Sequence, residues 1–465
     1  MVSASRPLAA MVLPVLVLLA GTARADAVDD YLEREREALG FPGLSLAVVR
    51  DGRVVKARGY GLASLELGVP ATKESVYEIG SLTKQFTATA VMMLVEEGRI
   101  RLDDSLARFF PDGPGWWKEI TLRHLLNHTS GILNYTDVGD FLALGRTDFT
   151  RERILELLYA LPSEFAPGAT WSYSNTGYYL LGMVIEKASG RSYWEFLEER
   201  IFGPLGMRST RSADPRAIVP NRAAGYGKAK GGLENRAPLT PSAAGAAGAI
   251  LSTAVDLARW DAALRGPKLV GASSLREMWT PSRVTGGGVA PVPYGFGWAT
   301  SDHRGRRAVL HGGGTPGHSS VIYRALDEGL TVILLANLGD RLTEQLAVEV
   351  AGLYHPALAR PRRPAAPPDE RTAHTLRRAL GQLLEGRPDL DAFTPAARIF
   401  LGTSAGKGIW QWIGSHGPLG SFEHSDWEDV PEGRLHRCRA ILGKSAYRFS
   451  FLVDAEGRIA QAYWW

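Results

Sequence analysis

The stretch Tyr77-Glu78-Ile79-Gly80-Ser81-Leu82-Thr83-Lys84-Gln85-Phe86 runs directly into the apolar segment 87–95, and together they determine which fold is expected. The segment is rich in Ala, Met and Leu and has no breaker before Gly98, so it predicts a helix. Residues three apart share one helix face, which would bring Ser81 and Lys84 side by side at its beginning. A serine hydroxyl becomes an effective nucleophile when a neighbour takes its proton, and a lysine in an apolar setting can do so.

The Ser-x-x-Lys pattern alone is weak evidence for catalysis. About one or two chance matches are expected in a chain of this length at average residue usage. A second match occurs here at Ser404-Ala405-Gly406-Lys407. The alternative interpretation of the first match is that Ser81 caps a helix and Lys84 is solvated. Two later stretches bear on the choice.

The first of these is the turn Tyr173-Ser174-Asn175, which follows Pro167-Gly168 and precedes a predicted helix at 180–188. A tyrosine phenol can relay protons, and an asparagine amide can hold a substrate carbonyl. The alternative interpretation is an aromatic-rich turn without a catalytic role.

The second is Val309-Leu310-His311-Gly312-Gly313-Gly314, which is typical of a strand that ends in glycines. Two hairpins are also expected, one at 44–55 with an Asp51-Gly52 turn and one at 321–336. Further helices are expected at 29–39, 151–161 and 255–264. Hairpins at both ends of this region with helices between them favour one antiparallel sheet covered by helices.

Two histidines, His124 and His128, lie among leucines at helical spacing. They could be catalytic, but this pattern favours histidines with a structural role.

Ser-x-x-Lys, Tyr-x-Asn and a His-Gly-Gly strand, in this order, resemble the serine β-lactamase and penicillin-binding protein superfamily. The nearest branch is that of class C β-lactamases, family-VIII esterases and D-amino-acid peptidases. The resemblance covers roughly residues 29–353 and implies an α/β (α+β) fold, an antiparallel sheet flanked by helices with a helical subdomain. Other stretches that carry it are His124-Leu125-Leu126, Thr129-Ser130-Gly131, Pro204-Leu205-Gly206-Met207, Tyr294-Gly295-Phe296-Gly297-Trp298 and His311-Gly312-Gly313-Gly314-Thr315-Pro316-Gly317.

The resemblance implies a role for each matching residue. Ser81 would be the acylated nucleophile, and Lys84 and Tyr173 would share the general-base and general-acid work. Asn175 would orient the substrate or Lys84. The backbone N–H groups of Ser81 and Gly314 would form the oxyanion hole.

The resemblance also places His311 and Gly313 beside the substrate. In β-lactamases a lysine usually opens this third motif, whereas this chain has His311. Strong β-lactam hydrolysis is therefore not expected. Histidine at this place is common in the esterase and D-peptidase branches.

The first 25 residues have the pattern of a secretory signal peptide. Arg6 precedes an apolar run, and Ala23-Arg24-Ala25 fits a cleavage site. We expect export to the periplasm or the extracellular space, with no membrane anchor after cleavage. The formal charge of +4 falls to +2 without Arg6 and Arg24, which gives no indication of nucleic-acid binding.

Cofactor and metal sites are not expected. No Cys/His cluster has the spacing of zinc ligands, and the single cysteine, Cys438, cannot form an intramolecular disulfide. The expected partner is a small ester, amide or peptide substrate, whose identity the sequence does not specify. It does not specify the oligomeric state either.

Composition divides the remaining chain into a hydrolase domain at 26–358, a proline-rich linker at 359–370 and a small α+β domain at 371–465. In the last part helices are expected at 372–384 and 395–401, followed by four strands. This part resembles small cystatin-like or NTF2-like domains, which could shield the active site or bind a partner.

Two competing interpretations remain. Gly402-Thr403-Ser404-Ala405-Gly406 matches a nucleophile elbow, and Asp426 and His436 follow it in the order of a triad. However, the 61 residues after Ser404 lack the alternating strands and helices of an α/β-hydrolase. The second alternative is a catalytically weak penicillin-binding or sensing protein with the same fold.

Overall fold

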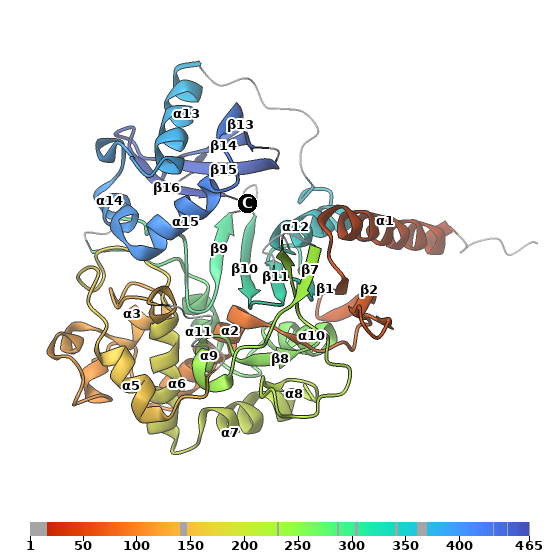
Figure 1. Cartoon of the computed structure of the whole chain (residues 1–465), viewed down its shortest axis with the longest axis horizontal. Coiled ribbons are helices and arrows are strands. Elements are labelled where there is room, and N and C mark those ends of the chain that lie inside the picture. Colours follow the sequence, from red (N-terminus) through yellow and green to blue (C-terminus); the bar gives the residue numbers. More distant parts are fainter. Residues whose placement is uncertain are drawn as a thin grey trace, which may run out of the picture.

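The computed structural model describes residues 16–139, 147–229, 232–285, 288–302, 306–339, 343–359, 370–430, 432–443 and 445–464 (Figure 1). Nearly all of the predicted linker lies outside these residues, as does the predicted leader up to residue 15. The predicted cleavage site after Ala25 falls within helix α1, Leu16–Leu39.

The part of the chain predicted to be the hydrolase domain, and called so below, is built on a seven-stranded sheet in the order β3-β2-β1-β12-β11-β10-β9. Its paired neighbours are antiparallel, as predicted. Asp51 and Gly52 both have positive φ, which suits the tight turn between β1 and β2. The strands are β1 (Gly43–Arg50), β2 (Arg53–Ser64), β3 (Val69–Pro70), β9 (Ala299–Asp302), β10 (Arg307–Gly314), β11 (Ser319–Ala325) and β12 (Leu330–Ala336).

Both faces of this sheet are covered, because a central strand such as β1 presents apolar residues on both faces. In β1, Leu44, Leu46 and Val48 pack in one core with α1 and α12 (Thr343–Tyr354). Ala47 and Val49 pack in a second and larger core on the opposite face. Helix α10 (Ala254–Ala263) contacts β1 and β12. The resulting order is helices, sheet and helices.

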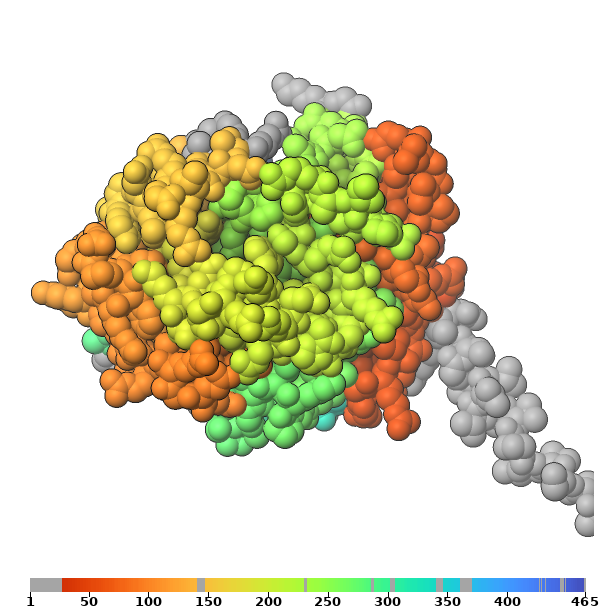
Figure 2. All heavy atoms as spheres, turned by 90° about the horizontal axis from the view of Figure 1, so that it is seen from below, coloured from red at the N-terminus to blue at the C-terminus, as the bar shows by residue number. Residues whose placement is uncertain are grey.

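The helical subdomain carries much of the larger core. Helix α2 (Thr83–Glu96) is buried from Thr83 to Leu94 and contacts α6, α7 and α9. Figure 2 shows, from below, that segments coloured orange to green build this face of the molecule. The remaining helices of the hydrolase domain are α3 (Leu122–Leu126), α5 (Arg151–Tyr159), α6 (Asn175–Ser189), α7 (Tyr193–Leu197), α8 (Gly203–Leu205), α9 (Pro241–Gly248) and α11 (Ala272–Met278).

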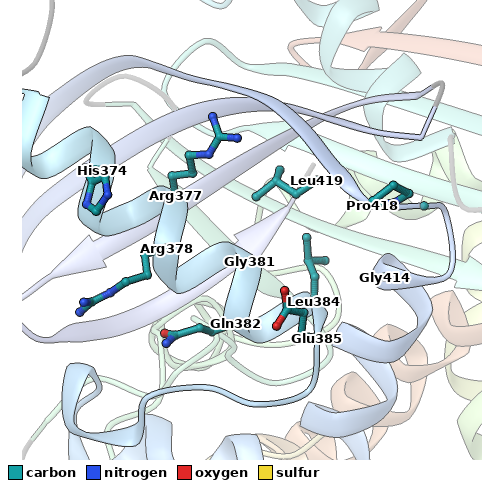
Figure 3. Close-up of a pocket in the computed structure, with 11 residues that line it drawn as sticks. His374, Arg377, Arg378, Gly381, Gln382, Leu384, Glu385, Gly414, Pro418 and Leu419 are labelled. Atoms are coloured by element: carbon teal, nitrogen blue, oxygen red, sulfur yellow. The ribbon is translucent and has the colours of Figure 1, made fainter.

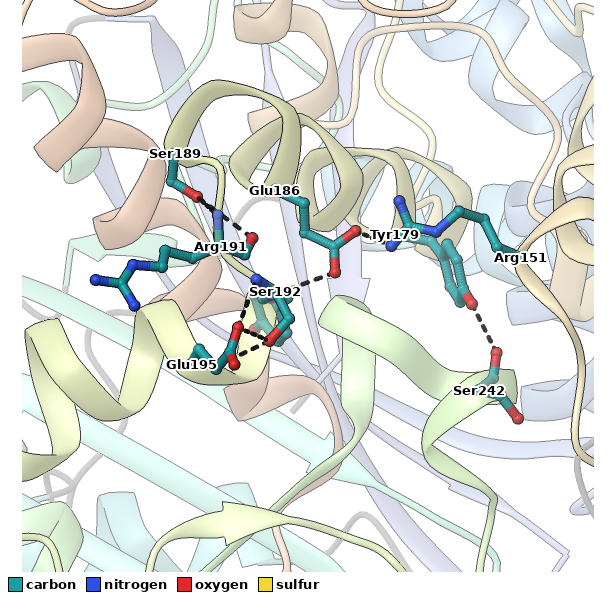
Figure 4. A network of polar contacts seen from close by, with 9 residues as sticks. Arg151, Tyr179, Glu186, Ser189, Arg191, Ser192, Glu195 and Ser242 are labelled. Carbon is teal, nitrogen blue, oxygen red and sulfur yellow. Dashed lines mark hydrogen bonds and ion pairs between the residues drawn. The ribbon is translucent and has the colours of Figure 1, made fainter.

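A polar network joins the helices α5, α6, α7 and α9 (Figure 4). Glu186 in α6 accepts hydrogen bonds from the side chain of Arg151 in α5 and from the backbone N–H of Tyr193, which begins α7. Tyr179 donates to the carbonyl of Ser242 in α9, at 2.7 Å. The network therefore ties α6 to three neighbours, and α6 is the helix whose first residue is Asn175.

Short strands complete the hydrolase domain. They form one sheet in the order β4-β8-β5 and a separate pair, β6-β7. Strand β4 leads directly to Ser81. The strands are β4 (Tyr77–Glu78), β5 (Arg211–Ser212), β6 (Tyr226–Ala229), β7 (Gly232–Asn235) and β8 (Ile250–Ser252).

The C-terminal domain is an antiparallel meander, β13-β14-β15-β16, with three helices packed on it. The strands are β13 (Leu419–Val430), β14 (Gly433–Leu442), β15 (Ser445–Val453) and β16 (Ile459–Trp464). The helices are α13 (Glu370–Leu384), α14 (Pro395–Gly402) and α15 (Ser404–Gly414). The predicted strands and two of these helices are confirmed, whereas α15 was not predicted. In the described part of the chain, no helix is both long and apolar enough to cross a bilayer.

Candidate active site

Ser81 and Lys84 lie together at the beginning of the central helix, as predicted. Ser81 belongs to the 3-10 turn η1 (Gly80–Leu82), and Lys84 is the second residue of α2. Ser81 is partly exposed, whereas Lys84 has 0% of its surface exposed. Ser81 does not cap either helix, because neither has a side-chain cap. The alternative interpretation, a capping serine with a solvated lysine, is therefore wrong.

The Lys84 amine contacts three oxygen atoms. It donates to Ser81 Oγ at 3.1 Å, to Asn175 Oδ1 at 2.7 Å and to the carbonyl of Ala247 at 2.8 Å. An ammonium has three protons, so this set can satisfy it in a dry site. If Lys84 lost one proton, the nitrogen lone pair could face Ser81, and the Ser81 hydroxyl could then donate its proton to that nitrogen. The amine is thus placed to exchange a proton with the Ser81 hydroxyl.

Tyr173 and Tyr178 supply aromatic walls for this amine. The Lys84 nitrogen lies 4.8 Å from the ring centroid of Tyr173 and 5.5 Å from that of Tyr178. The Tyr178 hydroxyl donates to the carbonyl of Leu126 at 2.6 Å. Burial raises the pKa of Tyr178 well above its ordinary value. Tyr178 therefore stays protonated. Tyr173, in contrast, is partly exposed, and its ring lies beside the Lys84 amine.

Asn175 is the first residue of α6, and its backbone N–H and side-chain amide donate hydrogen bonds to the segment 134–136. Its backbone N–H donates to Asn134 Oδ1 at 2.9 Å, and its Nδ2 donates to Thr136 Oγ1 at 3.2 Å. The side-chain oxygen is thereby turned toward Lys84. Asn134 and Thr136 were not predicted, because they belong to no motif in the sequence.

The glycine-rich end of β10 lies against the turn that carries Ser81. A Cβ on Gly313 would lie 2.0 Å from the carbonyl oxygen of Ile79 and 2.4 Å from Ser320 Oγ. Only glycine fits such an approach. A Cβ on Gly80 would lie 2.7 Å from the carbonyl oxygen of Gly314, so Gly314 is beside the residue preceding Ser81. The two N–H groups predicted for the oxyanion hole thus come from neighbouring segments.

His311 lies near this site but bonds within the protein. It is 6% exposed, its Nδ1 donates to the carbonyl of Gly312 at 2.6 Å, and its Nε2 lies 2.7 Å from the Tyr294 hydroxyl. Burial raises the pKa of Tyr294 well above its ordinary value, so this hydroxyl keeps its proton and can donate to Nε2. Both contacts suit a neutral imidazole. Its ring centroid is 6.3 Å from that of Tyr173.

His124 and His128 both support the local structure. His124 accepts from the backbone N–H of Thr121 and closes a capping box at the start of α3. His128 accepts from the backbone N–H of Ser174 at 3.2 Å, and its ring lies 4.4 Å from that of Tyr173. Burial, followed by the charge of Lys84, lowers the pKa of His128 well below its ordinary value. His128 is therefore a neutral support behind Tyr173.

The second Ser-x-x-Lys match has different surroundings. Ser404 begins α15 immediately after α14, and Thr403 caps α15 by accepting from the N–H of Gly406. A nucleophile elbow requires a strand before the serine. His436 contacts His424 at 3.1 Å. The α/β-hydrolase alternative is therefore wrong.

A hollow of about 780 Å³ lies elsewhere, in the C-terminal domain (Figure 3). It is lined mainly by α13 and by the segment that leads into β13, and it includes none of the predicted catalytic residues. Within the residues described above, no group of three His, Cys, Asp or Glu is arranged to hold a metal ion.

The model of the beta-lactamase family matches residues 28–353, most of the chain. The chain belongs to the beta-lactamase family. Penicillin-binding protein 4* of Bacillus subtilis (strain 168) is 33% identical over 332 residues, covering 66% of this chain and 71% of that protein. Esterase EstB of Burkholderia gladioli is 30% identical over 366 residues, covering 68% and 90%.

Solved structures agree with this assignment to the beta-lactamase family. A D-stereospecific amidohydrolase from Streptomyces sp. is 33% identical, with a TM-score of 0.59, and the match covers 70% of this chain and 97% of that one. The predicted fold class is confirmed. The chain is a serine hydrolase of the type that acts through an acyl-enzyme.

Proposed function

We propose that this beta-lactamase family member hydrolyses small esters or amides through an acyl-enzyme on Ser81. The observation that carries the proposal is the buried Lys84 amine 3.1 Å from Ser81 Oγ, with Asn175 and Ala247 as its other acceptors. A lysine without its proton can take the serine proton as Oγ attacks the substrate carbonyl. The carbonyl carbon gains the bond to Oγ, and its oxygen becomes negative.

Collapse of this intermediate breaks the bond to the leaving group. The leaving group takes a proton from Tyr173 or Lys84, and the acyl group remains on Ser81. A water molecule then attacks the acyl carbon and gives a proton to the same pair. The bond from the acyl carbon to Ser81 Oγ breaks, Oγ takes that proton back, and the acid is released. The N–H groups of Ser81 and Gly314 would stabilise the oxyanion in both steps.

The substrate class follows from the third motif. His311, with both nitrogens bonded to Gly312 and Tyr294, suits the neutral form and offers little attraction to an anion. Neutral esters or amides are therefore favoured over carboxylate-bearing β-lactams. Relatives named as an esterase and as a D-stereospecific amidohydrolase support this preference.

A weak penicillin-binding or sensing protein is the second candidate, because two relatives are named penicillin-binding proteins. Such a protein would form an acyl-enzyme and release it slowly. The signal-peptide pattern of residues 1–25 supports a site of action outside the cytoplasm for either candidate.

The test is a substrate panel on the purified protein lacking the predicted leader. It contains nitrophenyl esters, D-amino-acid amides and a chromogenic cephalosporin, with Ser81→Ala as the control. We expect turnover of esters or amides that the control lacks. Stable acylation by the cephalosporin without turnover of any substrate would favour the sensing protein. Equal turnover by the control would overturn both.

A further inference from the structure

We propose that Phe400, in the C-terminal domain, is a positioning residue for the reaction at Ser81. The proposal rests on the function proposed above. Phe400 lies in α14 and is 5% exposed. Its ring packs on Trp171 of the hydrolase domain, with 5.9 Å between the ring centroids. Trp171 lies two residues before Tyr173 in the chain, so Phe400 contacts the segment that carries Tyr173.

Trp171, which Phe400 contacts, is connected through neighbouring rings to the Lys84 amine. Trp171 lies 6.3 Å from Tyr173 and 6.1 Å from Tyr294 between ring centroids. The Tyr173 ring in turn lies 4.8 Å from the Lys84 amine. Two ring contacts and one amine contact therefore connect the C-terminal domain to the proton-transfer pair.

Hydrogen bonds also join the C-terminal domain to the two segments of the hydrolase domain that carry Tyr173 and Tyr294. Thr170, next to Trp171, donates from Oγ1 to the carbonyl of Ala396 at 2.7 Å. Gln461 donates from Nε2 to the carbonyl of Ala290, four residues before Tyr294, also at 2.7 Å. The C-terminal domain thus contacts the segments that carry Tyr173 and Tyr294, from α14 and from β16.

Phe400 lies outside the main core of its own domain. That core contains Leu380, Trp410 and Phe449 among others, whereas Phe400 belongs to a separate cluster with Trp171 and Tyr294. A buried aromatic ring of the C-terminal domain therefore belongs to a cluster that joins residues of the other domain with Ala396, Leu401 and Ile409 of its own. Rigid support of this kind matters at active sites, because a misplacement of about 1 Å can lower turnover by about a hundredfold.

The experiment compares full-length variants of neighbouring residues in α14. Phe400→Ala removes the ring from Trp171, and Ile399→Ala is the matched control, because Ile399 is 39% exposed. We expect Phe400→Ala to lower kcat for a nitrophenyl ester about tenfold with KM within about twofold, and Ile399→Ala to change neither. Phe400→Leu keeps most of the volume, and a loss of only about threefold is expected. If Phe400→Ala does not fold, Phe400→Leu supplies the measurement.

A double-mutant cycle separates positioning from general support. Tyr173→Phe removes only the hydroxyl, so Phe400→Ala should lower kcat by no more than about twofold in that background. A full tenfold loss there would overturn the proposal, as would an unchanged kcat in both Phe400 variants. Activity retained by Ser81→Ala would instead overturn the proposed function, so the two failures are distinguishable.

Discussion

The chain contains the same four-residue pattern twice, in two different surroundings. At Ser81 the lysine three residues later is completely buried and contacts three oxygen atoms. At Ser404 the corresponding Lys407 is exposed. The Ser404 backbone N–H donates to Glu164 of the other domain at 2.7 Å. One serine thus lies beside a desolvated amine, and the other helps to join two domains.

The difference shows that spacing alone does not make a serine reactive. A lysine in water holds its proton at neutral pH, because its ordinary pKa is about 10.4. Burial disfavours the charged form, and nearby acceptors favour it. A site can balance the two effects only where other segments enclose the amine, as α6 and α9 do at Lys84.

The largest expected effect distinguishes the two serines directly. Ser81→Ala should lower kcat by about a thousandfold or more, because no group remains to be acylated, and Ser404→Ala should change kcat by less than about twofold. Mass spectrometry after fluorophosphonate treatment should find the adduct on the peptide with Ser81. An adduct on Ser404 would reverse the comparison.

The two lysines should differ almost as strongly. Lys84→Met removes the proton acceptor and should lower kcat by about a hundred- to a thousandfold. Lys407→Met changes an exposed side chain and should leave kcat unaltered. Circular dichroism and thermal melting check that each variant folds. Comparable turnover by Lys84→Met would assign the proton transfer to another group.

Tyr173→Phe sharpens the comparison, because no equivalent tyrosine accompanies Ser404 in any predicted motif. Loss of the hydroxyl should lower kcat about a hundredfold and leave the thermal midpoint nearly unchanged. The control is Tyr179→Phe, which also removes one hydroxyl, in this case the donor to the carbonyl of Ser242, and it should keep normal kcat. A Tyr173→Phe variant with normal turnover would leave Lys84 to act alone.

Local sequence was sufficient for the central parts of this site. Ser81 and Lys84 are three residues apart on one helical surface, so their contact depends on helix geometry alone. The β1–β2 hairpin was predictable because Asp51-Gly52 suits its turn. Asn175 was found by its place after Tyr173, although α6 begins earlier than the predicted 180–188.

The missing parts come from tertiary packing. Ala247 supplies a backbone carbonyl from α9, in an Ala- and Gly-rich region with no periodic apolar signal. Asn134 accepts from the Asn175 N–H, and the Tyr294 hydroxyl contacts His311. The stretch that begins at Tyr294 belongs to the family resemblance, but nothing in the sequence predicts either contact. Phe400 lies more than 200 residues from Trp171, so its contact could not be inferred from spacing.

Removal of the region that contains the second pattern tests whether it is separable. A chain that ends at Pro368 should fold, because the main core of the C-terminal domain is distinct from the two main cores of the hydrolase domain, and the clusters that span both parts, such as the one around Phe400 and Trp171, are small. It should lose about tenfold to thirtyfold in kcat, since the contact of Phe400 with Trp171 is lost. The full-length Phe400→Ala variant provides the comparison. Insoluble or unfolded protein would mean that the two parts share a core and that the predicted boundary is wrong.

The smallest expected effect concerns charge rather than the nucleophile. His311 donates through Nδ1 to Gly312 and faces the Tyr294 hydroxyl through Nε2, an arrangement that suits a neutral ring. His311→Lys would place a second ammonium near Ser81, and an ammonium remains charged at any physiological pH. The ratio of kcat/KM for a cephalosporin to that for a short nitrophenyl ester should rise about tenfold, equivalent to about 1.4 kcal/mol.

This ratio is measured for both proteins at about pH 5.5 and about pH 7.5, between which histidine side chains ordinarily change charge. Protonation would make Nε2 a donor and add a positive charge, so a ratio for the natural protein that is higher at the lower pH would show that His311 gains this charge. The ratio for His311→Lys should stay constant, because its charge does not change. His311→Gln, which is neutral at both pH values, is the control and should give a low and constant ratio. A ratio that does not move in His311→Lys would show that this position does not face the anionic group of the substrate.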